Sequence, residues 1–202
     1  MTRSAGRRPA ELFACAPRLV PSCASTARKS GVVEGLLGRR IPPVVLQECC
    51  CSPLNLGEFA SLFSLVLYFY AGSPGSLDGE DAPCMDGIQH RAFRDSGREL
   101  SALGFQAIGV SSQSGRAQRQ AVLANRVGHR LLSDPELLLA QQLGLPTFKA
   151  DGAWWYQRLV LLITGGRVAQ AFSVCDPARS PAQAIAWILI HSGWPDAGVD
   201  VS

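Results

Sequence analysis

The sequence predicts an α/β domain with a mixed central sheet, and three observations lead to this fold class. Leu65–Tyr70 is apolar or aromatic at every position, which is typical of a central strand covered on both faces. Helical and strand patterns then alternate as far as Leu143, which indicates parallel strands joined by crossover helices. Finally, Arg158–Thr164 and Arg167–Val174 flank Gly165-Gly166, the pattern of an antiparallel β-hairpin.

The elements around the central strand follow from local signals. Upstream, Val44–Leu46 predicts a short edge strand and Asn55–Phe63 a helical turn or loop. Downstream, Gly72–Pro83 is a long loop, and loops of such length are often functional or disordered. Gly87–Leu103 then has its apolar residues on one face, so we expect an amphipathic helix that ends at Gly104.

The second half of the chain continues the alternation. Phe105–Ser111 predicts a strand, and Ser114–Val127 a helix whose first residue is a suitable N-cap. A short strand starts at Leu131, and the Asp-Pro pair that opens Asp134–Leu143 predicts another helix. After the hairpin, Ser180–His191 forms the last helix. This order suits a thioredoxin-like fold, a mixed central sheet flanked by helices, whose reactive group follows the first long strand.

Charge divides the chain into two parts. Residues 1–40 hold eight basic and two acidic residues, whereas the rest holds eleven basic and fourteen acidic residues. We predict a basic, disordered N-terminal extension over residues 1–40 and one domain over residues 41–202. Seven irregularly spaced cysteines indicate a reducing compartment, so we expect a cytoplasmic protein. Import into an organelle is the alternative, because the extension resembles a transit peptide.

Several classes of function are disfavoured. No apolar run reaches the roughly 20 residues that cross a bilayer. The basic extension has only Phe13 as an interleaved aromatic residue, which argues against nucleic-acid binding. Cys49–Cys51 lacks the spacing of a zinc site, and Ser111–Arg116 lacks a phosphate-binding fingerprint. We therefore expect no cofactor, no metal, no nucleic acid and no membrane as partner.

Cys84 is the residue best placed for chemistry. It lies between the central strand and the following helix, just before the helix start. A thiol at a helix N-terminus faces unpaired N–H groups and the positive end of the helix dipole, and both lower its pKa. The alternative is a loop cysteine without a function, and spacing alone leaves both interpretations open.

Three segments of the chain resemble the peroxiredoxins, in particular the bacterioferritin-comigratory type and related redoxin-domain proteins. They are Leu65–Ala71 (LVLYFYA), Ala92–Val110 (AFRDSGRELSALGFQAIGV) and Leu131–Pro146 (LLSDPELLLAQQLGLP). The resemblance covers about residues 41–190 and implies a thiol-dependent peroxidase. In that family a thiolate, here Cys84, attacks a peroxide and becomes a sulfenic acid, while an arginine, here Arg158, holds the thiolate and the peroxide.

The resemblance also implies the partners of such an enzyme. They are hydrogen peroxide or an organic hydroperoxide as substrate, thioredoxin or a small thiol as reductant, and a second copy of the chain in a possible homodimer. A resolving cysteine usually lies five residues after the first, but that position holds Gln89. Cys175 is one candidate for the resolving thiol, and Cys49–Cys51 or an external thiol are others.

The sequence departs from the family where the reactive cysteine is expected. If the helix is aligned on Ala92–Asp95, the cysteine of the family falls on Asp86, two residues after Cys84. The usual proline after the aromatic strand and the nearby threonine are also missing. An Asp86 carboxylate paired with Arg158 would leave this site without peroxidase chemistry. The alternative function is therefore a catalytically degenerate thioredoxin-fold module for binding or scaffolding.

An aromatic cluster, Trp154-Trp155-Tyr156, comes shortly before Arg158. Such clusters mostly anchor a loop by packing, and this is the simpler interpretation. The alternatives are a wall of the substrate pocket or a contact between subunits.

Overall fold

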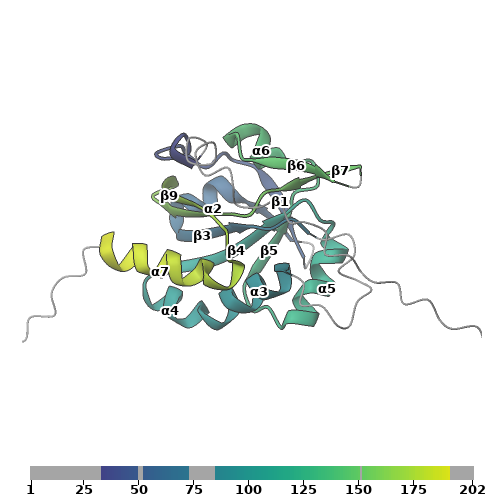
Figure 1. Ribbon diagram of the computed structural model, residues 1–202. Coiled ribbons are helices and arrows are strands. Elements are labelled where there is room, and N and C mark those ends of the chain that lie inside the picture. Colours follow the sequence, from purple (N-terminus) through teal and green to yellow (C-terminus); the bar gives the residue numbers. More distant parts are fainter. Residues whose placement is uncertain (1–32, 50–51, 73–84, 151, 192–202) are drawn as a thin grey trace, which may run out of the picture.

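The structure is a computed structural model, and it describes residues 33–49, 52–72, 85–150 and 152–191. Within these ranges the chain forms a seven-stranded sheet and a separate two-stranded hairpin (Figure 1). The elements are β1 (Val45–Glu48), β2 (Pro53–Asn55), α2 (Leu56–Leu62), β3 (Ser64–Phe69), α3 (Met85–Asp95), α4 (Gly97–Ala102), β4 (Phe105–Ser111), α5 (Gly115–Asn125), β5 (Arg130–Ser133), α6 (Leu138–Leu143), β6 (Thr147–Ala150), β7 (Ala153–Tyr156), β8 (Leu159–Thr164), β9 (Arg167–Ser173), a 3₁₀ turn η1 (Pro177–Arg179) and α7 (Ser180–His191).

The sheet has a parallel centre and antiparallel edges. The strand order is β2-β1-β5-β4-β3-β8-β9. Strands β3, β4 and β5 are parallel, while β1 runs antiparallel to β5, β8 to β3 and β9 to β8. Strand β3 lies inside the sheet and is buried from Leu65 to Phe69. The α/β fold class and the mixed central sheet are therefore confirmed.

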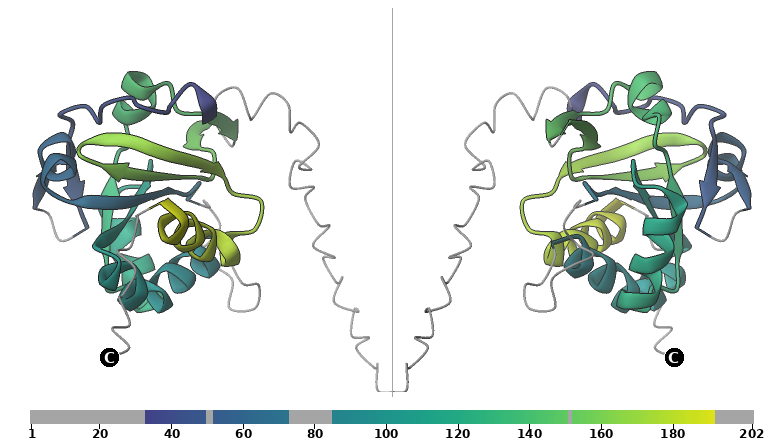
Figure 2. Two further views of the ribbon diagram at one scale, coloured as in Figure 1. Left: turned by 90° about the vertical axis from the view of Figure 1, so that its left-hand side faces the viewer. Right: turned by 90° about the vertical axis from the view of Figure 1, so that its right-hand side faces the viewer.

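Two apolar layers enclose the sheet. Because side chains alternate along a strand, Leu65, Leu67 and Phe69 of β3 face one layer and Val66 and Tyr68 the other. Helices α3, α4, α5 and α7 cover the Tyr68 face, and α2, α6 and the β6–β7 hairpin lie on the Phe69 face (Figure 1). Figure 2 shows the same division from the two sides.

Several local signals are confirmed in detail. The β8–β9 turn has Gly165 at φ 56° and Gly166 at φ 73°, the left-handed conformations that a two-residue hairpin turn requires. The Ser114 side chain caps α5 by accepting from the backbone N–H of Ala117 at 3.4 Å. Helix α7 spans Ser180–His191, as expected.

Other boundaries differ from the sequence-based expectation. The single helix expected over Gly87–Leu103 is two helices, since the Ser96-Gly97 pair disfavours a helix interior. The helix expected from Asp134 begins at Leu138, because the Asp134 carboxylate accepts from the backbone N–H groups of Leu138 and Leu139. Strand β1 is not an edge strand, since the unexpected β2 pairs with it. The β6–β7 hairpin was also not expected.

Residues 33–40, which the charge pattern assigned to the extension, pack on the domain. Leu36 is buried in the Phe69-face core. The backbone N–H of Gly38 donates to the Val168 carbonyl at 2.8 Å, so this segment is tied to β9. The rest of the extension lies outside the described residues. Among the helices that the structure describes, none has the length and apolar character that a bilayer crossing needs.

Candidate functional site

The site lies where β3 ends and α3 begins, the place where the sequence predicts a reactive group. Asp86 is in the first turn of α3, and only 5% of its surface is exposed. Cys84 comes one residue before α3 and lies outside the described residues, so its assignment as the reactive thiol stays a prediction. Asp86 is the position onto which the family alignment placed the reactive cysteine.

Arg158 binds the Asp86 carboxylate. Its Nη2 lies 2.5 Å from Asp86 Oδ1. Leu159 pairs with Phe69 in the sheet, so Arg158 stands next to the end of β3. The backbone N–H of Gly72 donates to the second carboxylate oxygen, Oδ2, at 3.0 Å. Both oxygens of Asp86 are therefore held, one by a guanidinium and one by the chain that leaves β3.

This pairing satisfies a costly buried charge. An ionised carboxylate removed from water is unfavourable unless a cation or hydrogen-bond donors compensate it. The guanidinium supplies that compensation, and a quarter of the Arg158 side chain stays exposed. Its Nε is buried and has no hydrogen-bond partner among the described residues. The arrangement therefore holds the Asp86 carboxylate at the start of α3, and within the described part of the chain the Nε donor of Arg158 is not used.

A buried hydrogen-bonded cluster lies beside the pair, under β3. The Tyr68 hydroxyl is 2.8 Å from His90 Nδ1 and 2.6 Å from His129 Nε2. His90 lies one helical turn after Asp86 on the buried face of α3. Since a hydroxyl can donate once and accept as well, Tyr68 donates to one neutral imidazole and accepts from the other.

Burial keeps both imidazoles neutral. It lowers the pKa of His90 to about 4, with the positive charges of Arg91 and Arg158 acting in the same direction. It lowers the pKa of His129 to about 3, with His90 contributing. Burial also raises the pKa of Tyr68 well above its ordinary value, and the nearby Tyr70 and Asp86 add to that shift. The cluster is therefore uncharged at neutral pH.

This cluster was not found from the sequence. Spacing along the chain does not predict it, because Tyr68 lies 22 and 61 positions before its two histidine partners. Within the described residues, no group of three or more His, Cys, Asp or Glu side chains could hold a metal ion. The signal that could have found the cluster is a tyrosine at an inward position of the central strand, which needs a polar partner when buried.

Cys175, one candidate for the resolving thiol, is exposed just beyond β9. The backbone N–H of Val174, its neighbour, donates to the Arg158 carbonyl at 3.2 Å. Cys175 therefore directly follows the residue whose backbone is hydrogen-bonded to Arg158. Cys49 is buried at the end of β1, and the other two cysteines of the Cys49–Cys51 run lie outside the described residues.

Comparisons with known proteins define the class of the chain. Its fold is that of the peroxiredoxins. The peroxidoxin BcpB from Mycobacterium tuberculosis aligns with a TM-score of 0.64 and 20% identity, over 77% of this chain and 97% of that one. Peroxiredoxin Q from Xanthomonas campestris aligns with a TM-score of 0.64 and 18% identity, over 78% of this chain and 99% of that one. Reduced Prx3 from Vibrio vulnificus in complex with hydrogen peroxide aligns with a TM-score of 0.61 and 17% identity, over 78% of this chain and 98% of that one.

A family model that matches the sequence identifies the family of the chain. The Redoxin model matches residues 36–185, most of the chain, and the protein belongs to the Redoxin family. The expected membership of the redoxin-domain proteins is thus confirmed, and the solved structures confirm the peroxiredoxin fold. A search of the curated proteins gave no match.

Proposed function

We propose that this chain is a peroxiredoxin-fold binding module in which a carboxylate has replaced the reactive thiolate. The observation that carries the proposal is the ion pair between Asp86 and Arg158 at the start of α3. The arginine that the family uses to hold an anionic sulfur here holds an anionic side chain of the protein itself. The scaffold is kept, and Asp86 fills its anion site.

The chemistry of a carboxylate supports this proposal. A thiol peroxidase needs a nucleophile that attacks a peroxide oxygen, gives up an electron pair and becomes a sulfenic acid. An aspartate has no such oxidation ladder. Its pairing with Arg158 also uses a guanidinium N–H that would otherwise help polarise the peroxide O–O bond. Among the described residues, the site therefore has no thiol that could donate electrons, and its guanidinium is already engaged by Asp86.

The test is to put the thiol back. In an Asp86→Cys variant, a thiol at the helix N-terminus beside Arg158 should ionise at neutral pH. Ionisation alone should make it about 30-fold more reactive than an ordinary cysteine with a pKa near 8.5. Stopped-flow consumption of hydrogen peroxide by this variant and by the wild type measures the difference. An Asp86→Cys/Arg158→Gln variant is the control, and it should lose most of the gain.

The second candidate is the thiol-dependent peroxidase that the family suggests, with Cys84 as its nucleophile. It is favoured by the position of Cys84 directly before α3 and by the membership of the Redoxin family. The Cys84 thiolate would attack the peroxide, giving a sulfenic acid and, with one proton, water or an alcohol. Thioredoxin or a small thiol would then reduce the sulfenic acid. This candidate includes Cys175 as resolving thiol, a cytoplasmic location and a homodimer.

One measurement separates the two candidates. The wild type is treated with one equivalent of hydrogen peroxide, and the oxidised cysteine is located by mass spectrometry. A binding module shows slow oxidation spread over its seven cysteines. A peroxidase shows one fast-reacting thiol, which disappears in a Cys84→Ser variant, and a Cys175→Ser variant then accumulates the sulfenic acid.

A further inference from the structure

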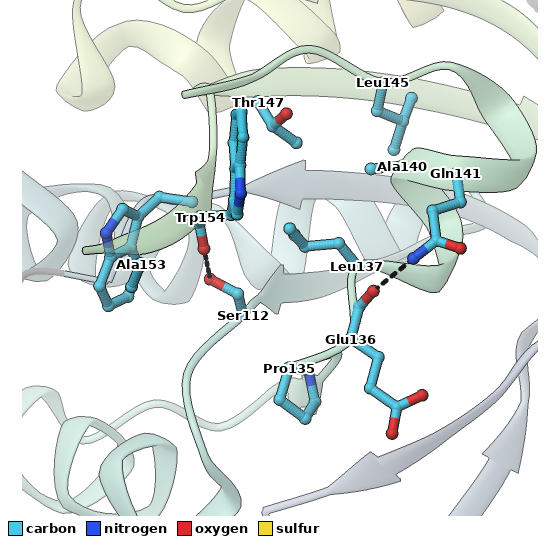
Figure 3. Close-up of a pocket in the computed structure, with 11 residues that line it drawn as sticks. Ser112, Pro135, Glu136, Leu137, Ala140, Gln141, Leu145, Thr147, Ala153 and Trp154 are labelled. Carbon is cyan, nitrogen blue, oxygen red and sulfur yellow. Dashed lines mark hydrogen bonds between the residues drawn. The ribbon is translucent and has the colours of Figure 1, made fainter. Parts of the chain in front are cut away.

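Two cavities of similar volume lie on opposite faces of the sheet, and they differ in the charge of their linings. The cavity on the Phe69 face has a volume of about 600 Å³ and lies between α6 and the β6–β7 hairpin (Figure 3). Its one charged lining residue, Glu136, directs its carboxylate away from Leu137 (Figure 3). The Ser112 hydroxyl already donates to the Trp154 carbonyl at 3.1 Å. Among the described residues, this lining therefore offers no charged group to a ligand.

The cavity on the Tyr68 face has basic residues above an apolar floor. It has a volume of about 670 Å³ and lies between the α3–α4 segment and the connection from α5 to β5. We refer to this cavity as the Arg98 groove. Its volume is within the range of about 300–1,000 Å³ that is usual for small-molecule sites. Its floor belongs to the core on the Tyr68 face and consists of Phe105, Ala107, Val122 and Val127.

One helical face brings Arg94, Arg98 and Ser101 to the Arg98 groove. The backbone N–H of Ser96, at the junction of α3 and α4, donates to the Ala92 carbonyl at 3.1 Å. The helical hydrogen-bond pattern therefore continues from α3 into α4. Residues 94, 98 and 101 then stand at positions i, i+4 and i+7, which share one face of a helix. All three are part of the groove lining.

A hydrogen bond fixes the direction of the Arg94 side chain. Its Nη1 donates to the Asn125 carbonyl at the end of α5 at 2.8 Å, so the guanidinium points from α3 toward α5. Its Nε donates to Asp95 at 2.8 Å, and 65% of the Asp95 side chain is exposed, so this ion pair contributes little. Nη2 has no partner among the described residues and can bind a ligand.

Arg98 supplies the second positive charge. It is exposed, and none of the ion pairs between described residues includes it. The other charged lining residues, Glu48 and Arg130, pair with each other at 2.8 Å. Arg130 also lies over the ring of Phe59, which packs on the opposite face of the sheet. The charge that a ligand meets in the groove therefore comes from Arg94 and Arg98.

We propose that the Arg98 groove binds a phosphate monoester with a small apolar body. Two guanidinium groups match the charge of about −2 that such a phosphate carries at neutral pH, and their planar N–H groups match its oxygens. The apolar floor covers the body of the ligand.

The Arg98 groove is separate from the Asp86 site. It lies at the amino ends of β4 and β5, whereas Asp86 follows the carboxyl end of β3, and these three strands are parallel. The inference therefore goes beyond the proposed function and does not depend on it. Peroxide chemistry at Cys84 would overturn the proposed function and leave phosphate binding measurable.

The test uses three probes that separate the charge from the apolar body: phenyl phosphate, inorganic phosphate and benzyl alcohol. Each is titrated into ¹⁵N-labelled full-length protein at neutral pH and constant ionic strength, and binding is followed by NMR. The Gly128 N–H and the His129 ring line the groove and should shift and saturate, whereas the His191 ring on α7 should not.

The three affinities should differ in a fixed order. Phenyl phosphate should bind about tenfold more tightly than benzyl alcohol, because each of two exposed charge interactions contributes up to about fivefold. Inorganic phosphate should bind about tenfold more weakly than phenyl phosphate, because it buries no apolar surface. Equal affinities of phenyl phosphate and either of the other two probes would overturn the proposal.

Two matched variants make the test specific. Arg98→Gln should weaken phenyl phosphate binding about fivefold. Arg116→Gln removes the same charge from the exposed first turn of α5 and should leave the affinity unchanged. The proposal is overturned if Arg98→Gln binds like the wild type or if Arg116→Gln weakens binding as much. It is also overturned if the Gly72 N–H shifts in place of Gly128, because the anion then lies at the Asp86 site.

Discussion

Two buried aspartates stand near the starts of two helices, one on each face of the sheet, and they differ in what holds them. Asp134 precedes α6 and is 1% exposed. It accepts from the backbone N–H groups of Leu138 at 2.9 Å and Leu139 at 3.0 Å, and from the Tyr156 hydroxyl. Asp86 accepts from one backbone N–H, that of Gly72, and from the guanidinium of Arg158.

The difference separates a carboxylate that fixes local structure from one that is paired with a cation from a distant segment. All three donors to Asp134 are neutral, and two belong to the helix that it caps, so it fixes local structure. The partners of Asp86 come from other segments, and one is a cation that needs some anion at this position. A thiolate would meet that need as well as a carboxylate does. Under the proposed function, Asp86 takes the place at which the family holds a thiolate beside this arginine.

The largest effect is expected from removing the architectural carboxylate. Asp134→Ala leaves two helix N–H groups and the buried Tyr156 hydroxyl without their acceptor. We expect the free energy of unfolding to fall by about 4 kcal/mol, measured by urea denaturation. Asp176→Ala is the matched control, since this exposed aspartate caps η1 by accepting from Ala178 N–H and should cost about 1 kcal/mol or less. Equal losses in both variants would refute the architectural role.

The Asp86–Arg158 pair should respond differently to single and double changes. Arg158→Met alone leaves a buried carboxylate without its cation, so we expect a loss of about 3 kcal/mol. Asp86→Leu combined with Arg158→Met removes both charges, and stability should return to within about 1 kcal/mol of the wild type. A double-mutant cycle by chemical denaturation measures this coupling. If the double variant is as unstable as Arg158→Met, the loss of stability does not come from the unpaired Asp86 carboxylate.

The sequence identified the scaffold better than the contacts within it. The all-apolar run Leu65–Tyr70 and the Gly165-Gly166 turn are local signals with one structural solution each, and both elements formed as expected. The position of Asp86 near Arg158 could also be predicted, because the alignment of the helix with the family places the family's cysteine position on Asp86. The alternative to a pairing of Cys84 with Arg158, a salt bridge between Asp86 and Arg158, is what the structure contains.

Features that depend on distant partners were not predicted. Asp134 was expected to begin a helix at once, yet its carboxylate caps N–H groups four and five residues later, with Tyr156 as a third donor. The β6–β7 hairpin has no alternating pattern strong enough to indicate strands, because Trp154 and Phe148 stay exposed. The Tyr68 cluster joins residues 22 and 61 positions apart, a pairing that spacing along the chain does not reveal.

Acidification should weaken the face of the sheet that holds Asp86. The pKa values of His90 and His129 are lowered to about 4 and about 3, so the folded chain excludes protons that the unfolded chain binds below pH 6.5. Stability therefore falls as the pH falls through this window. From pH 6.5 to 5.5 we expect a loss of about 1 kcal/mol for each histidine, or about 2 kcal/mol together, measured by urea denaturation.

Two variants test the source of this pH dependence. His129→Gln should halve the loss between pH 6.5 and 5.5, because one of the two buried imidazoles is gone. His191→Gln should leave it unchanged, since that ring is exposed on α7 and outside the Tyr68 cluster. A wild-type stability that is flat over this pH range would show that the imidazoles are hydrated in the native state.

The smallest effect compares one hydroxyl from each face of the sheet. Tyr156→Phe removes one of the three donors to Asp134 and the acceptor of the Ala140 N–H, and we expect a loss of about 1 kcal/mol. Tyr70→Phe is the comparison on the other face, because the Tyr70 hydroxyl is buried near Ser111 and Gln118 but makes no hydrogen bond of normal geometry among the described residues. Its removal should change stability by less than about 0.5 kcal/mol, or raise it, since an unpaired buried hydroxyl costs free energy. A larger loss for Tyr70→Phe than for Tyr156→Phe would mean that the Asp86 face, and not the Asp134 face, contains the stronger polar network.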